Sequence, residues 1–427
     1  MVNWLVTHTP LFYLTQSLWR DEAFSVLIAE YGITDIVRLT AADYSPPLYY
    51  FLLHYWMMIA GNGEIAVRVL SFLFFIALLV IIYVFARDVL KLRRNDRIAV
   101  TVLMAVNPML LYYAFEARAY MLAVLLVSTA MYAFMQKRWW LFRITSLLAL
   151  YTHPYTVFVL FAPVIYSVLQ KDFKLLKQVV RSSLIIMAGY LPWLFVIVKQ
   201  ILESGSMWFY PVDRNLAEAV AGNLYLGFEG NPPWFWLLSK YITLVIFALI
   251  TLGLLNSSSR NKKWFLFVWF LFPIALTVGI SFIKPIFVAR YVLYSTVALV
   301  LLVGLGIMAI KNSTVKWGVF CMVLTATVWF NSWYAPYHAK VDFRRTLSGI
   351  ETQFQKGDII QAASALAYFE TVYYAPDRGA VYLQRSDQSP LPRYVGSVLI
   401  PRERWLAEPS AGVNMFTVFE DGSYTKQ

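Results

Sequence analysis

Long stretches of consecutive, mostly apolar residues recur along this chain and constrain its fold more than any other feature. Examples are residues 67–85, 184–198, 241–255 and 287–310. About 20 such residues span the hydrocarbon core of a bilayer as a helix. Only 14% of the residues are charged, whereas soluble domains carry about a quarter. The sequence therefore predicts a polytopic, all-α membrane protein.

The basic residues indicate which helix ends face the cytoplasm. Of the 36 Lys and Arg residues, 17 lie in five short clusters between apolar stretches, and such loops stay cytoplasmic under the positive-inside rule. The net charge of +12 thus reflects topology and not nucleic-acid binding, which needs the charge on one face of a folded domain. We predict eleven spans, with a cytoplasmic N-terminus and an extracytoplasmic C-terminus. The spans are 3–18, 65–86, 98–114, 118–136, 139–152, 154–170, 181–200, 234–255, 264–283, 287–310 and 315–334.

Two segments need a separate interpretation. Residues 46–60 (PPLYYFLLHYWMMIA) reach only about 22 Å as a helix, less than the hydrocarbon core of about 30 Å, so we predict a helix lying in the outer interface. Residues 335–427 carry ten basic and ten acidic side chains, which predicts a small extracytoplasmic α/β domain after a transmembrane domain, 1–334. Its expected strands are 358–361, 371–374, 380–383, 396–400 and 415–419.

Polar side chains gather at the predicted outer ends of the spans. Asp21 and Glu22 follow the first apolar stretch, and repulsion between adjacent carboxylates favours one of them as a base. The other candidates are Asp43, Tyr49, His54, Arg68, Glu116, Arg118, Tyr120, His153, Lys284, Arg290 and Tyr291. Solvated loop acids, snorkelling arginines or a helix-end histidine would explain each one singly. Because ionisable groups near membrane depth usually mark a substrate path, their convergence favours a site for a lipid-borne phosphate and a polar reaction partner.

Six sequence blocks carry a resemblance to a known family. In order they are WRDEAFS, SPPLYYFLLHYW, AVRVLS, NPMLLYYAFEARAYML, YTHPYTVF and FVARYVLYSTVALVLL. This order resembles the GT-C superfamily, and within it the polyprenyl-phosphate sugar transferases related to protein mannosyltransferases and lipid A aminoarabinose transferase, with an RgtA/B/C/D-like domain. The resemblance covers roughly residues 15–310. It implies a cell-envelope enzyme that transfers a hexose or pentose, with inversion, from a polyprenyl-phosphate sugar to an acceptor that the sequence does not identify.

The resemblance also implies roles for particular residues. Asp21 corresponds to the catalytic base, with Glu22 beside it, and Arg118 and Arg290, with Arg68 less directly, correspond to the phosphate-binding residues. Guanidinium groups bind phosphate oxygens through two donors and stabilise the departing phosphate. No metal or other cofactor is expected, although some relatives use a divalent ion, which would lie at Asp21 and Glu22.

Two other functions remain open at this point. A flippase or other transporter of lipid-linked sugars would place its polar residues near the midplane on helices related by a repeat, and the sequence has no visible repeat. A noncatalytic scaffold with an external binding domain would have no reason to gather carboxylates and arginines at one face of the bilayer. Neither alternative needs Asp21, so its substitution distinguishes them from the enzyme.

Overall fold

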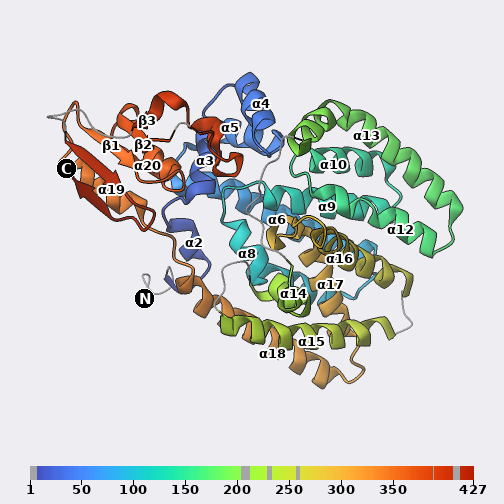
Figure 1. The fold of residues 1–427 in the computed structure, drawn as a ribbon. Helices are drawn as coiled ribbons and strands as arrows, with labels where there is room; N and C mark the ends of the chain where they lie inside the picture. Colours follow the sequence, from blue (N-terminus) through green and yellow to red (C-terminus); the bar gives the residue numbers. More distant parts are fainter. Residues whose placement is uncertain (1–6, 203–211, 228–232, 256–259, 388, 407–413) are drawn as a thin grey trace.

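The computed structural model describes residues 7–202, 212–227, 233–255, 260–387, 389–406 and 414–427. Helices make up most of the chain, and a small sheet lies at one end of the helix bundle (Figure 1). The predicted fold class, a helical membrane protein with a small C-terminal α/β region, is confirmed.

The predicted first span, 3–18, is not formed in the described residues, and residues 3–6 lie outside them. α2 (Leu11–Thr15) has only five residues. The guanidinium of Arg68 donates to the backbone carbonyls at positions 14, 16 and 17, so a side chain satisfies these carbonyls where a longer helix would have used N–H groups. Asp21 and Glu22 consequently lie in the first turn of the next helix, α3 (Arg20–Ala29), and not in a loop.

Two further short helices precede the first long one. They are α4 (Ile33–Ala42) and α5 (Leu48–Ala60). The helix predicted for residues 46–60 is therefore present, and its 13 residues are too few to span a bilayer. Its position in the outer interface stays a prediction.

Five helices of the described chain are long and apolar enough to cross a membrane. They are α6 (Glu64–Asp88), α13 (Phe173–Leu202), α15 (Pro233–Leu255), α16 (Arg260–Ser281) and α18 (Ser313–Tyr337). A sixth candidate is the pair α7 (Arg94–Ala105) and α8 (Pro108–Ala114), which is bent by 62°. The bend falls at Asn107-Pro108, where the proline interrupts the helix.

The other spans predicted from the sequence correspond to shorter apolar helices. These are α9 (Tyr120–Met135), α10 (Trp139–Leu150), α11 (Thr156–Val159), α12 (Ala162–Leu169) and α17 (Tyr294–Met308). By length and composition the described residues thus provide five or six of the eleven predicted spans. α14 (Arg214–Leu226) and the 3-10 turn η1 (Ala289–Val292) were not predicted.

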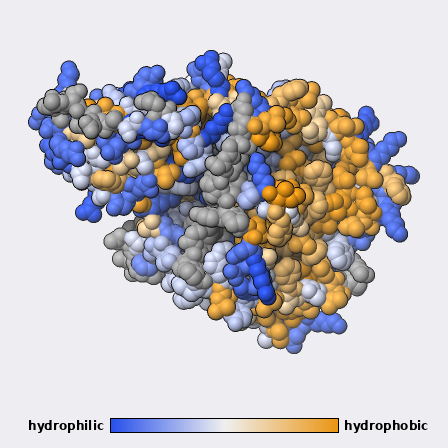
Figure 2. All heavy atoms as spheres, in the orientation of Figure 1, coloured by the Kyte–Doolittle hydropathy of each residue, from blue (hydrophilic) through white to orange (hydrophobic). Residues whose placement is uncertain are grey.

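α17 lies at the centre of the bundle. Every residue from Tyr294 to Ile307 is buried, and a Cβ on Gly306 would lie 2.2 Å from the carbonyl oxygen of Leu249 on α15. The outer helices instead carry exposed apolar side chains, such as Leu184 and Phe195 on α13. Figure 2 shows this apolar surface over the bundle, with hydrophilic residues over the sheet at one end and at the opposite tips. The molecule is a multi-pass membrane protein.

The C-terminal region forms a five-stranded sheet with the order β3-β2-β1-β4-β5, parallel except for the last pair. The strands are β1 (Ile359–Ala362), β2 (Val381–Gln384), β3 (Trp405–Leu406), β4 (Met415–Val418) and β5 (Tyr424–Lys426). The helices and 3-10 turns are α19 (Phe343–Glu351), α20 (Tyr368–Tyr374), η2 (Arg378–Ala380), η3 (Arg393–Val395), η4 (Ser397–Leu399) and η5 (Arg402–Arg404).

Three of the five predicted strands are present, as β1, β2 and β4. Residues 371–374 belong to α20, and residues 396–400 form mainly the turn η4. The helix buries Phe369 and Thr371 against α3, and Gly396 at φ 75° ends the preceding turn, so tertiary packing and a turn override the short apolar runs.

The C-terminal region shares a hydrophobic core with α3 and α5. The rings of Phe24 on α3 and Phe369 on α20 lie 5.2 Å apart between centroids, and the same core contains Tyr49 and Leu53 of α5 and Phe416 of β4. Figure 1 shows α3 to α5 between the sheet and the long helices. This packing fixes the C-terminal region over the helix ends where the predicted polar residues gather.

Candidate active site

A cavity of about 450 Å³ lies where α3, the loop before α5, the start of α9, the α10–α11 turn, the end of α13 and η1 meet the C-terminal region. Its polar lining consists of Arg20, Asp21, Asp43, Tyr44, Ser45, Tyr50, Arg118, Tyr120, Thr152, His153, Tyr155, Gln200, Lys284, Arg290, Tyr291 and Tyr394. Segments that are far apart in the sequence thus line one cavity.

Eight of the residues predicted from the sequence meet in this cavity. They are Asp21, Asp43, Arg118, Tyr120, His153, Lys284, Arg290 and Tyr291. The other five predicted residues do not line it. They are Glu22, Tyr49, His54, Arg68 and Glu116.

Asp21 is surrounded by arginines. Its carboxylate lies 3.1 Å from Nε of Arg20 and 3.7 Å from Nη2 of Arg118, and Arg118 also donates to the Asp21 carbonyl oxygen at 3.2 Å. Burial alone would raise the pKa of Asp21, but the charges of Arg118, Arg20 and Arg290 outweigh it and lower the pKa. The carboxylate therefore stays ionised and balances part of the positive charge.

Asp43 has a different environment at the end of α4. Its carboxyl lies close to two neutral donors, the backbone N–H of Tyr44 and the hydroxyl of Ser45. Burial raises its pKa to about 6, against the effect of these donors and the charge of Arg118, with further repulsion from Asp21. The cavity thus contains two carboxyl groups whose affinities for a proton differ.

Aromatic rings hold the two arginines in place. The guanidinium of Arg118 lies 5.7 Å from the ring of Tyr120, and that of Arg290 lies 5.6 Å from the ring of Tyr291, which suits cation–π attraction. The two tyrosine rings stack at 6.3 Å. His153 packs against both, and burial together with Arg118 and Arg290 lowers its pKa to about 3. At neutral pH His153 is uncharged, so the positive charge here comes from the arginines and Lys284.

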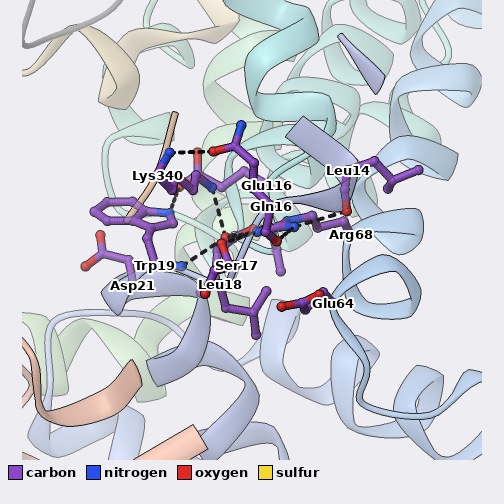
Figure 3. Close-up of polar contacts among 12 residues, drawn as sticks. Leu14, Gln16, Ser17, Leu18, Trp19, Asp21, Glu64, Arg68, Glu116 and Lys340 are labelled. Atoms are coloured by element: carbon purple, nitrogen blue, oxygen red, sulfur yellow. Dashed lines mark hydrogen bonds and ion pairs between the residues drawn. The ribbon is translucent and has the colours of Figure 1, made fainter. Parts of the chain in front are cut away.

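Glu22 and Arg68 form a buried ion pair and do not line the cavity. Figure 3 shows Arg68 beside Leu14, Gln16 and Ser17. Arg68 donates to Glu22 through Nε at 2.8 Å and Nη2 at 2.6 Å, and its other N–H groups bind the carbonyls at positions 14, 16 and 17. Glu22 also accepts from Nζ of Lys340 at 2.9 Å and from the backbone N–H of Ala117 at 2.9 Å. These contacts tie α3, α6, the α8–α9 loop and the start of the C-terminal region together.

Glu116, Tyr49 and His54 also lie outside the cavity. Glu116 accepts from Nε1 of Trp19 at 3.0 Å, and burial raises its pKa to about 7. Tyr49 is fully buried in α5. Nδ1 of His54 lies 2.7 Å from the carbonyl oxygen of Ala29 and joins α5 to α3. These contacts connect the start of α3 to the α8–α9 loop and α5 to α3.

Several cavity residues were missed by the sequence analysis. Arg20 could have been found, since it precedes Asp21 directly. Tyr50 and Tyr155 lie inside two of the quoted sequence blocks. No local pattern indicates the others, which include Gln200, Phe369, Tyr394, Val395 and Gly396.

The described residues bring no three His, Cys, Asp or Glu side chains together at metal-binding distance. Arg68, Lys340 and the Ala117 N–H already occupy the oxygens of Glu22, so Asp21 and Glu22 do not form a ready pair of metal ligands. The expectation that no metal is needed stays a prediction.

Comparison with known proteins identifies the fold. No protein-family model and no curated protein matches the chain. Among solved structures, ArnT from Cupriavidus metallidurans in the apo state matches with a TM-score of 0.66 and 13% identity, over 98% of this chain and 90% of that one. The same protein bound to undecaprenyl phosphate matches with a TM-score of 0.66 and 12% identity, over 98% and 91%. The chain has the fold of ArnT, as the predicted GT-C architecture implied.

Proposed function

We propose that this protein is a membrane-embedded glycosyltransferase that moves a sugar from a polyprenyl-phosphate donor to an acceptor on the outer face of the membrane. The observation that supports this most is the clustering of Arg20, Arg118, Lys284 and Arg290 around Asp21 and Asp43 in one cavity. Preorganised cations of this kind stabilise the charge on a departing phosphate. The ArnT structure with the same fold was solved with undecaprenyl phosphate bound.

A path for the lipid part of the donor supports the proposal. Ile197 and Ile201 near the end of α13 line the cavity, and Ile201 is 60% exposed. It continues the apolar outer surface of α13, where Phe195 and Val198 are also exposed. A polyprenyl chain can therefore lie along this surface in the bilayer with its phosphate at Arg118 and Arg290.

The charge distribution supports an outer-face site. From α6 onward, successive helices run in alternating directions across the bilayer. The basic segments at their ends, such as 91–97 and 260–263, therefore fall on the side opposite the cavity. The positive-inside rule makes that side cytoplasmic. The cavity and the C-terminal region then face outward. Because α2 is too short to span, residues 7–18 would also lie outside, in contrast to the cytoplasmic N-terminus inferred from eleven spans.

The reaction needs a base as well as cations. The acceptor hydroxyl must lose its proton as it attacks the anomeric carbon, and Asp21 and Asp43 are the two acidic side chains lining the described cavity. Glu22 and Arg68, which were expected to take part in catalysis and phosphate binding, would instead support the site from outside it. The transferred sugar is a hexose or a pentose.

Binding of undecaprenyl phosphate to the purified protein tests the proposal. Arg118→Lys and Arg290→Lys keep one positive charge but lose the two-donor fork, so each should weaken binding measurably. Arg38→Lys, at a side chain that is 81% exposed on α4, is the matched control and should bind like the wild type. Mass spectrometry of lipid-linked and surface glycans, with and without the gene, should identify the transferred sugar. Equal binding by all four proteins would contradict the assigned phosphate site.

A further inference from the structure

The two cavity carboxyl groups are held by different kinds of partner. Asp21 faces guanidinium groups, with Arg20 at 3.1 Å and Arg118 at 3.7 Å. Each such contact stabilises the ionised carboxylate and makes it a weaker proton acceptor. Protonating Asp21 would also leave the half-buried arginines with less compensating charge.

Asp43 lies next to neutral donors and forms no ion pair. The Tyr44 N–H and the Ser45 hydroxyl lie close to its carboxyl, and no Lys, Arg or His of the described chain forms an ion pair with it. It is 8% exposed and lines the cavity. A buried carboxylate without a cationic partner gains most from taking up a proton.

The backbone around Asp43 is held firmly. Pro46 and Pro47 stiffen the chain after it. The side-chain amide of Gln200, near the end of α13, donates to the carbonyl of Ala41 at 3.0 Å and to that of Asp43. Gln200 is itself 4% exposed. A loop anchored by a buried amide presents its carboxyl in a fixed position, as a base that must reach one hydroxyl requires.

The charged and titratable groups that face Asp43 come from the neighbouring elements. Asp21 of α3 repels it, and Arg118 before α9 attracts it. Tyr50 of α5 lies beside it and shares the contact with Ser45, and α13 contributes the neutral Gln200. On this balance Asp43 is the carboxyl in the cavity that can exchange a proton near neutral pH.

We propose that Asp43 accepts the proton of the acceptor hydroxyl and that Asp21 positions Arg20 and Arg118 for the donor phosphate. This rests on the proposed glycosyl transfer. The hydroxyl oxygen forms a bond to the anomeric carbon while the bond from that carbon to the phosphate oxygen breaks. The bonding electron pair leaves with the polyprenyl phosphate, beside the arginines. The hydroxyl proton moves to Asp43, which then releases it to water.

The division of roles predicts the pH dependence of kcat/KM. Asp43 must be ionised to act, and burial raises its pKa to about 6, so kcat/KM should rise with pH through about 6 and then level off. A base with the lowered pKa of Asp21 would instead be ionised throughout this range and would give no such rise. Glu370 also has a raised pKa, about 8 because of burial, but it does not line the cavity. Glu370→Gln should therefore keep the rise near pH 6.

The test uses the full-length protein in detergent or lipid. A panel of undecaprenyl-phosphate hexoses and pentoses serves as donor, membranes from cells lacking the gene supply the acceptor, and released undecaprenyl phosphate is measured. Asp43→Asn should lower kcat by about 10²–10⁴-fold and abolish the rise near pH 6, with binding of undecaprenyl phosphate unchanged. Asp21→Asn should weaken that binding but keep the rise. Added formate should restore part of the activity of Asp43→Ala, which a purely structural role of Asp43 would not allow.

Opposite results would overturn the assignment. If Asp43→Asn transfers sugar at more than about a tenth of the wild-type rate, or if Asp21→Asn alone loses the pH-dependent rise at unchanged undecaprenyl phosphate affinity, Asp43 is not the base. The glycosyltransferase proposal would survive both outcomes. A wild-type protein that neither binds undecaprenyl phosphate nor releases it from any donor of the panel would overturn both proposals together. Size-exclusion profiles establish that each variant is folded, and Asp43→Glu gives a second, charge-preserving variant in which the rise should persist at a shifted pH.

Discussion

Replacing Glu22 by glutamine tests whether this carboxylate holds the site together or takes part in catalysis. Glu22 accepts from Arg68 at 2.8 and 2.6 Å, from Lys340 at 2.9 Å and from the Ala117 N–H at 2.9 Å. Glutamine keeps one oxygen but turns an NH₂ group toward these donors, and it leaves two buried cations without their counter-ion. Breaking a buried ion pair by removing one partner costs about 3–5 kcal/mol.

The lowered pKa of Glu22 gives a similar value for its contribution to the free energy of folding. Burial alone would raise this pKa, but Arg68 and Lys340 outweigh burial and lower it to about 2. Each pH unit corresponds to about 1.4 kcal/mol, so a carboxyl held at about 2 and not at its ordinary 4.5 contributes on the order of 3 kcal/mol to folding. This contribution is fully present above pH 4.5 and is lost as the pH falls toward 2.

Thermal unfolding followed by tryptophan fluorescence in detergent measures the effect. At pH 7 the Glu22→Gln protein should unfold several degrees below the wild type, and the difference should shrink as the pH is lowered from 4.5, because only the wild type loses stability there. Glu116→Gln is the matched control. Burial raises the pKa of Glu116 to about 7, so this carboxyl is already partly neutral and its replacement should cost less than about 1 kcal/mol.

One result would refute this account of Glu22. A Glu22→Gln protein that unfolds at the wild-type temperature, binds undecaprenyl phosphate normally and has lost only its turnover would make Glu22 part of the chemistry. The role expected from its place beside Asp21 would then be correct.

Two further predictions concern topology and packing. The topology test replaces Cys321, which is exposed, by serine and introduces single cysteines. Cysteines at Tyr31 and Asn62 should both react with a membrane-impermeant thiol reagent in intact cells, whereas a cysteine at Lys174 should not. Labelling of Tyr31 and Asn62 from opposite sides would contradict the topology. Gly306→Ala should lower the unfolding temperature, because its Cβ would lie 2.2 Å from the Leu249 carbonyl oxygen. Gly318→Ala has no atom within 4 Å of the new Cβ, so it should leave the unfolding temperature unchanged or raise it slightly through better helix propensity. Equal effects of the two changes would argue against the close contact of α17 with α15.

The membrane architecture could be predicted from the sequence because its causes are local. A backbone in a bilayer must satisfy its hydrogen bonds within each helix, so an apolar stretch such as 67–85 predicts its own structure, and the basic loops predict its direction. Whether the short helices α9 and α17 span the membrane was harder to predict, since burial among other helices and exposure to lipid favour the same apolar residues. The first predicted span is not formed in the described residues, since the carbonyls of residues 14, 16 and 17 bind the distant Arg68.

The cavity likewise combines residues that the sequence predicts with residues that only the folded chain brings together. Eight predicted polar residues meet there because helix ends on one side of a membrane converge. Which of two adjacent acids enters the cavity could not be predicted, since neighbouring residues on a helix point about 100° apart and only packing orients the helix. Asp21 turns to the cavity and Glu22 to Arg68 and Lys340. Gln200, which anchors Asp43, and Gly396, which closes the cavity from the C-terminal region, come from elements far away in sequence. Only the folded chain brings them together, because long-range packing and not local pattern decides which side chains share a cavity.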